Sequence, residues 1–201
     1  MAKTSPTDRV IALARRRGVI RTRDLTHRGI APVYLRRLEK EGILVRSARG
    51  LYRLADSDVT EHHDIAAAAK RVPHGVVCLL SALSFHGLTT QLPVEVWLAI
   101  DRAARHPKTE WPPLRVVRMS GRALTEGVES RRIEGVRVRV FNVAKTIADC
   151  FKYRNKIGLD VALEALREVW RGQRVTMDDL TRYARICRVS RVMRPYLESL
   201  T

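Results

Sequence analysis

The chain has 201 residues, 45% of them hydrophobic, which suffices for one large domain or two small ones with an ordinary apolar core. Its formal net charge of +17 and sequence pI near 10.9 favour a polyanionic partner such as nucleic acid, with a membrane surface as the alternative. No apolar run reaches the roughly 18 residues that span a membrane, and the first ten residues lack the apolar core of a signal peptide. We therefore expect a cytoplasmic protein without membrane insertion.

Two helices are predicted at the start of the chain. The capping-box pattern at residues 5–8 begins a helix that ends at Gly18. A second, shorter helix begins near Thr22, whose hydroxyl is expected to cap it. Asp24 in its first turn is favourable at the positive helix end, and Gly29 terminates it.

A third helix is predicted over residues 32–41. Pro32 suits its first turn, because that position needs no N–H. Leu35 and Leu38 lie three positions apart on one apolar face, and we expect Val33 to be partly buried. This leaves polar and basic side chains to project outward, namely Tyr34, Arg36, Arg37 and Lys40.

Residues 43–54 predict a hairpin with a basic tip. β-forming residues at 43–45 and 51–54 flank a turn at 47–50. Helix, turn, helix and hairpin in this order predict a winged helix-turn-helix, whose second helix enters the major groove while basic groups on flanking elements hold the DNA backbone. The predicted DNA-binding residues are Thr22, Arg23, Pro32, Tyr34, Arg36, Arg37, Lys40, Arg46, Arg49 and Arg53. A winged helix that binds only protein is the alternative.

The polar, acidic stretch at 55–61 predicts a linker between a DNA-binding domain at 1–56 and a second domain at 62–201. The second domain begins with predicted helices and strands in mixed order. They are a helix at 64–71, a strand at 76–80, a helix at 81–86, strands at 94–100 and 114–118, and a hairpin at 132–141 that turns at Glu134 and Gly135.

The end of the chain is predicted to be helical. Asn142 and Thr176 are suitable N-caps, an apolar stripe marks a helix from Leu159 to Trp170, and a last helix starts near Ser190. The predicted fold class is therefore α+β: an N-terminal winged helix-turn-helix, then a mixed α/β domain with a small mixed or antiparallel sheet and a helical C-terminal part.

A second basic surface is possible in this helical part. Arginines recur every third position from 182 to 194, and because such a row winds around a continuous helix, only a break near 189–190 would regroup it. With two neighbours the set is Arg171, Arg174, Arg182, Arg185, Arg188, Arg191 and Arg194. It can hold DNA backbone, face a nucleic-acid-bound partner, or form a solvated basic face.

No catalytic or metal site emerges from the sequence. Ser81 and His86 lack a nucleophile elbow, and we expect Ser81 to cap its helix and His86 to pack near the helix end. The cluster at 61–64 contains metal-ligand types, but adjacent residues point in different directions. The carboxylates Asp101, Glu110 and Asp149 are scattered.

The cysteines do not indicate a metal site either. Cys78, Cys150 and Cys187 form no C-x-x-C pair, so they read as reduced core thiols. We therefore expect a protein that is not an enzyme and that needs neither metal nor cofactor.

Three segments resemble the AbiEi family, antitoxins of type IV toxin–antitoxin systems that also repress transcription. The first is the wing sequence ILVRSARGLYRL at 43–54. The second is LLSALSFHGLTTQLP at 79–93, followed by VEVWLAI. The third is VFNVAKTIADCFKYR at 140–154.

The resemblance implies two functions. The N-terminal domain would bind inverted repeats in its own promoter, and the C-terminal domain would counteract a nucleotidyltransferase-like toxin encoded alongside, without requiring a stable complex. Two alternatives stay open: an interaction module that neutralises a toxin by direct binding, and a solitary transcriptional regulator without a toxin.

Overall fold

The computed structural model describes residues 5–56, 60–91, 93–109 and 111–200, and it divides the chain into two compact units. The first unit combines the described part of Met1–Arg71 with Arg132–Val138, and the second combines Val72–Arg131 with the described part of Arg139–Thr201. The centre of the predicted linker, residues 57–59, lies outside the described residues. The domain bounds 1–56 and 62–201 therefore stay a prediction.

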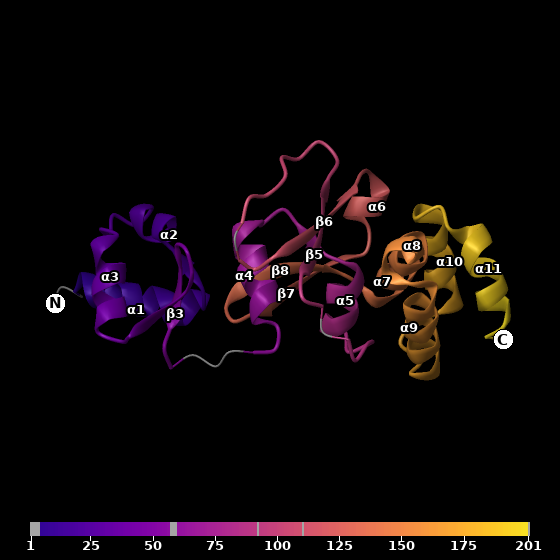
Figure 1. The fold of residues 1–201 in the computed structure, drawn as a ribbon, viewed down its shortest axis with the longest axis horizontal. Coiled ribbons are helices and arrows are strands. Elements are labelled where there is room, and N and C mark those ends of the chain that lie inside the picture. The colour runs from indigo at the N-terminus through magenta and orange to yellow at the C-terminus, as the bar shows by residue number, and fades with distance from the viewer. Residues whose placement is uncertain (1–4, 57–59, 92, 110, 201) are drawn as a thin grey trace. The chain divides into compact units, whose positions relative to one another are not determined.

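The first unit contains the predicted winged helix-turn-helix (Figure 1). Its elements are α1 (Pro6–Arg17), β1 (Ile20–Arg21), α2 (Thr22–Thr26), α3 (Val33–Lys40), β2 (Leu44–Ala48), β3 (Leu51–Leu54) and α4 (His63–Arg71). The strands form an antiparallel sheet in the order β1-β3-β2. β1 is an addition to the prediction, because two residues are too few to give a strand pattern.

Local capping and apolar spacing explain this arrangement. The Ser5 hydroxyl accepts the Asp8 N–H at 3.1 Å, and the Asp8 carboxylate accepts the Ser5 N–H, as the capping box predicts. α1 ends at Gly18, whose φ of +63° favours glycine. One face each of α1, α2 and α3 then packs with the sheet into a core that includes Val10, Leu13, Ile20, Leu25, Leu35, Leu38, Leu44 and Leu54.

Asp24 is the buried charged residue of this unit, and it binds several partners. Its carboxylate accepts the Arg21 N–H at 2.8 Å and lies 3.2 Å from Lys70 Nζ and 3.3 Å from Arg17 Nη1. Burial opposes ionisation of Asp24, but the Arg21 hydrogen bond and the charge of Lys70 outweigh it, so the pKa lies below its usual range. Asp24 therefore ties α2 to the ends of α1 and α4.

Replacing Asp24 with asparagine is expected to lower the free energy of unfolding by about 1.5–3 kcal/mol at neutral pH, the range for hydrogen bonds to charged groups. Because the folded-state pKa is depressed, this stabilisation is present above an unfolded-state pKa of about 3.9 and is lost as the pH falls through the folded-state value. Urea unfolding at several pH values measures it, with the exposed Asp56→Asn as control. A deficit that stays constant down to the most acidic pH would contradict the assignment.

The second unit has a mixed five-stranded sheet and a helical part. The sheet and its flanking helices comprise β4 (Val76–Val77), α5 (Leu79–Phe85), β5 (Val96–Asp101), β6 (Leu114–Met119), α6 (Arg122–Thr125), β7 (Val128–Ile133) and β8 (Val136–Phe141), except that the hairpin end Arg132–Val138 belongs to the first unit. The helical part comprises α7 (Val143–Lys152), α8 (Arg154–Ile157), α9 (Leu159–Arg171), α10 (Met177–Ile186) and α11 (Ser190–Glu198) (Figure 1). The predicted α+β fold class is confirmed.

The sheet order is β6-β5-β4-β8-β7. β4 pairs antiparallel with β5 and parallel with β8, and β5 pairs parallel with β6 along its whole length. The strand predicted at 76–80 has only two residues, because Cys78 is already the N-cap residue of α5. Ser81 is therefore not a cap: it lies inside α5, buried, where its hydroxyl accepts the Trp97 N–H at 2.9 Å.

α7 is the central helix of the helical part and packs against α5, α9, α10 and α11. Asn142 caps it by accepting the Lys145 N–H at 2.8 Å, as predicted. Lys145 and Asp149 are both buried, with their Nζ and Oδ2 atoms 2.5 Å apart, and the Cys187 thiol donates to the other Asp149 oxygen at 3.2 Å. Asp149 is thus an inter-helix contact in the core and not a surface residue.

Two other predictions concern the core and the membrane. The three cysteines are buried with free thiols, as predicted from their spacing. Within the described ranges, no helix is long and apolar enough to cross a bilayer.

Candidate nucleic-acid interface

α3 places an exposed, mostly basic face over a buried apolar edge. Leu35 and Leu38 are 1% and 0% exposed and anchor the helix in the core of the first unit. Pro32 is the N-cap residue, and the helix continues to Lys40. The exposed predicted residues of this segment are Pro32, Arg36, Arg37 and Lys40.

Two side chains of α3 differ from the prediction. Val33 is 62% exposed instead of partly buried, and Tyr34 is half-buried against the core instead of projecting outward. At about 100° per residue, Val33 lies nearly opposite the edge formed by Leu35 and Leu38, whereas Tyr34 lies at its flank. The spacing of the two leucines would therefore have been enough to predict that Val33 is exposed. Val33 is an apolar residue on the exposed face of α3.

The two adjacent arginines of α3 are not equivalent. Arg37 Nε donates to Glu41 Oε1 at 2.9 Å across one helical turn, and this hydrogen bond raises the Arg37 pKa above its usual range. No carboxylate of the described chain forms an ion pair with Arg36. Among the described residues, Arg36 therefore presents its guanidinium without an ion-pair partner, although Glu39 lies three positions further along the helix.

α2 presents Thr22 and Arg23, both exposed. The prediction that the Thr22 hydroxyl caps this helix is wrong, because the helix begins at Thr22 itself and Arg21 is the N-cap residue. Asp24 takes over the capping role by accepting the Arg21 N–H. The Thr22 hydroxyl is thereby left on the surface.

The wing is the β2–β3 hairpin, and its three arginines lie in different settings. Arg46 and Arg49 are exposed, Arg46 opposite Tyr52 on β3 and Arg49 at the tip beside Gly50. Arg53 is half-buried, and its Nη1 donates to the Leu54 carbonyl at 3.0 Å. The register shifts between Arg46 and Ala48, a bulge that re-aims the side chains around it.

The seven C-terminal arginines do not form one row. Arg182 pairs with Glu126 at 3.0 Å, Arg194 pairs with Glu198 at 2.8 Å, and Arg174 donates to the His86 carbonyl at 2.9 Å. The predicted break is present, because α10 ends at Ile186 and α11 starts at Ser190. Two of the arginines, Arg185 and Arg188, line one cavity together, and the exposed Arg171 and Arg191 are not among its lining residues.

The Ser81 and His86 side chains each form a hydrogen bond to a main-chain group of a neighbouring strand. The Ser81 hydroxyl bonds to the Trp97 N–H, and His86 Nε2 donates to the Phe141 carbonyl at 2.7 Å. Burial lowers the His86 pKa, which keeps the ring neutral at pH 7. These contacts make Ser81 and His86 packing residues that join α5 to neighbouring strands, with His86 at the helix end as predicted.

The acidic and histidine cluster at 61–64 stabilises a turn. His63 Nδ1 lies 2.7 Å from Glu134 Oε2, and Thr60 donates to the other Glu134 oxygen through both its N–H and its hydroxyl. Among the residues described, no group of three or more His, Cys, Asp or Glu side chains is placed to hold a metal ion. The contacts instead join the start of α4 to the β7–β8 turn within the first unit.

Comparisons with known proteins agree with the winged fold. Residues 8–55 match the model of a family described as "Transcriptional regulator, AbiEi antitoxin". The crystal structure of the RV2827C protein from Mycobacterium tuberculosis superposes with a TM-score of 0.60 at 18% identity, covering 89% of this chain and 70% of that chain, which shows a shared fold. No curated protein matches the chain.

Proposed function

We propose that the chain represses its own promoter and acts as the antitoxin of a type IV toxin–antitoxin system, because residues 8–55 match the family model of AbiEi antitoxin transcriptional regulators. In this proposal the winged domain binds inverted repeats in double-stranded DNA. The second unit counteracts a nucleotidyltransferase-like toxin without forming a stable complex. No step of this function requires catalysis by the chain or a cofactor.

The observation that carries the DNA half is the exposed face of α3. A rigid helix that presents arginine, lysine and one apolar side chain suits the major groove, where Arg binds guanine edges and apolar groups contact the thymine methyl. We assign base reading to Arg36 and the methyl contact to Val33. Arg37 and Lys40 are assigned to phosphates, Arg37 because Glu41 already engages its Nε.

In this proposal, side chains on α2 and on the wing contact the DNA backbone. Thr22 and Arg23 on α2 and Arg46 and Arg49 on the wing are exposed and carry hydroxyl or guanidinium donors. Such contacts fix the register of the protein on the duplex without reading sequence. Pro32, Tyr34 and Arg53 have structural roles. Pro32 is the N-cap residue of α3, Tyr34 packs at the flank of that helix, and Arg53 donates to the Leu54 carbonyl in the wing.

Binding of the full-length chain to its own promoter fragment tests the regulator. A shuffled duplex of equal length and composition is the control, and both are titrated at one fixed salt concentration because phosphate contacts make affinity strongly salt-dependent. We expect the promoter to bind at least about 1,000-fold more tightly, the lower end of specific recognition. Equal affinity for the two duplexes would remove the repressor assignment.

Co-expression with the protein encoded beside it tests the antitoxin. We expect that protein to arrest growth alone and to be harmless when this chain is present, without co-purification. Co-purification at near-equal amounts would favour neutralisation by direct binding. A harmless neighbour would leave only a solitary regulator.

A further inference from the structure

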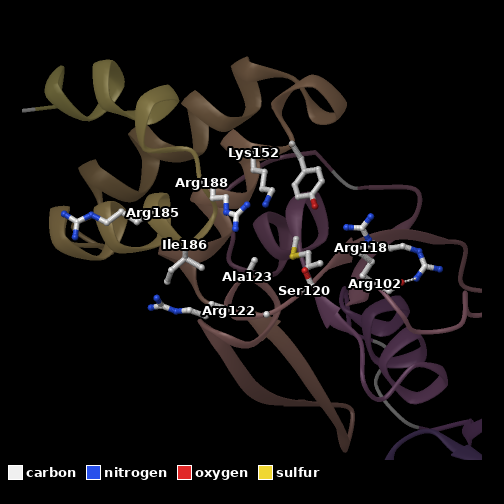
Figure 2. Close-up of a pocket in the computed structure, with 12 residues that line it drawn as sticks. Arg102, Arg118, Ser120, Arg122, Ala123, Lys152, Arg185, Ile186 and Arg188 are labelled. Atoms are coloured by element: carbon white, nitrogen blue, oxygen red, sulfur yellow. Dashed lines mark hydrogen bonds between the residues drawn. The ribbon is translucent and has the colours of Figure 1, made fainter.

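Six cationic residues line a cavity in the second unit (Figure 2). It measures about 730 Å³, within the rough 300–1,000 Å³ range of small-molecule sites. The cations come from the end of β5, β6, α6, the end of α7, α10 and the α10–α11 break. They are Arg102, Arg118, Arg122, Lys152, Arg185 and Arg188.

The charge of this cavity is poorly compensated. No acidic residue is among its described lining residues, and of the six cations only Arg122 forms an ion pair, with Glu126, within the described chain. Arg118 is held by three backbone carbonyls, those of Asp101, Arg102 and Ala104, which fix its guanidinium without neutralising it. Gathering like charges without counter-charges is unfavourable unless an anion occupies the space.

Arg188 holds an unusual backbone conformation at this cavity. Its φ is +59°, and the bonds from the Arg188 N–H to the Arg185 carbonyl and from the Val189 N–H to the Ala184 carbonyl form a Schellman motif. Glycine is the usual residue at such a position, because a side chain there is strained. In Figure 2 the Arg188 and Lys152 side chains both reach into the cavity from the helical part.

Hydroxyl donors complete the lining. Ser120 is exposed in the loop after β6, and Tyr153 follows Lys152 at the end of α7. Burial raises the Tyr153 pKa to about 12, so its phenol remains a proton donor at neutral pH. Guanidinium, ammonium and hydroxyl groups together are the donors that bind phosphate oxygens.

We propose that this cavity binds a compact ligand carrying two or more linked phosphate groups. Within the described chain, five of the cations have no carboxylate partner, and Arg185 among them extends away from Arg188 and Lys152 in Figure 2. The remaining four match the charge of a di- or triphosphate better than that of one carboxylate or one phosphate. The small-molecule volume of the cavity favours a compact anion over the extended backbone of a duplex. Nucleic-acid backbone shares the phosphate chemistry, so the test separates these two sources.

Titration of the full-length chain with inorganic tripolyphosphate, measured by calorimetry at about 0.15 M salt, tests the proposal. We expect saturable binding of one tripolyphosphate per chain, weaker binding of orthophosphate, and at least a tenfold loss of tripolyphosphate affinity in Arg188→Gly. Lys152→Met should show a similar loss. Arg167→Ala, which removes an exposed α9 arginine outside the lining, is the matched charge control and should bind as the wild type does.

Thermal unfolding separates binding from stability. Arg188→Gly relieves the left-handed strain, so it should unfold at the same or a higher temperature while losing affinity. The proposal is overturned if the wild type shows no saturable tripolyphosphate binding, or if both cavity variants match Arg167→Ala. It is also overturned if the variants weaken only the binding of a shuffled duplex. None of these readouts depends on promoter recognition by α3, so the two proposals fail separately.

Discussion

Arg36→Ala is expected to weaken promoter binding by roughly 5- to 150-fold, the equivalent of about 1–3 kcal/mol. The same variant should lose discrimination at one base-pair position, because it removes a group assigned to a base edge. Binding of the full-length chain to the promoter and to single-base variants of it, measured at constant salt, gives both quantities.

Arg49→Ala is the contrasting variant, because a wing arginine that contacts phosphate should weaken promoter and shuffled duplex alike. It should also reduce the slope of log affinity against log salt by about one. Arg167→Ala on α9 controls for net charge. If Arg36→Ala weakened every duplex equally, Arg36 would be a backbone contact and the base-reading assignment would be wrong.

Asp149→Ala is expected to lower the free energy of unfolding by about 3–5 kcal/mol, because it leaves the buried Lys145 ammonium without its partner. The loss includes the acceptor of the Cys187 thiol at the C-terminal end of α10. Urea unfolding followed by circular dichroism measures it.

The double variant Lys145→Met with Asp149→Leu is the matched control. It removes both charges and keeps apolar volume, so it should recover most of the stability, as apolar replacements of buried ion pairs often do. A loss below about 1 kcal/mol in Asp149→Ala would mean that the two side chains do not form the buried pair described above.

Elements with strong local signals were predictable from the sequence. The caps at Ser5, Asn142 and Thr176 each form the expected side-chain bond to the helix backbone, and the three helices start where predicted. The hairpin turn also lies at Glu134 and Gly135, as predicted. Gly135 has a φ of +74°, a conformation that glycine adopts far more readily than other residues, so a glycine is a strong signal for such a turn.

Features set by distant partners were not predictable in the same way. Asp24 replaced Thr22 as the capping group, and its burial depends on Lys70, far along the chain. The arginine row was visible in the sequence, but the Arg182 partner is Glu126, the residue that follows α6, more than 50 positions earlier in the chain. Sequence spacing alone does not show which cations of such a row are neutralised and which share a cavity.

The two-residue strand β4 has a consequence for the order in which the chain acquires its functions. Val77 pairs with Leu98 on one side and Val140 on the other. The sheet therefore cannot form until the ribosome has synthesised and released β8. At about 5–20 residues per second this delay lasts several seconds, during which the apolar cluster of the winged helix-turn-helix is already complete in sequence. A nascent or prematurely terminated chain would therefore carry α3, the helix that we propose reads DNA, before it carries the second unit.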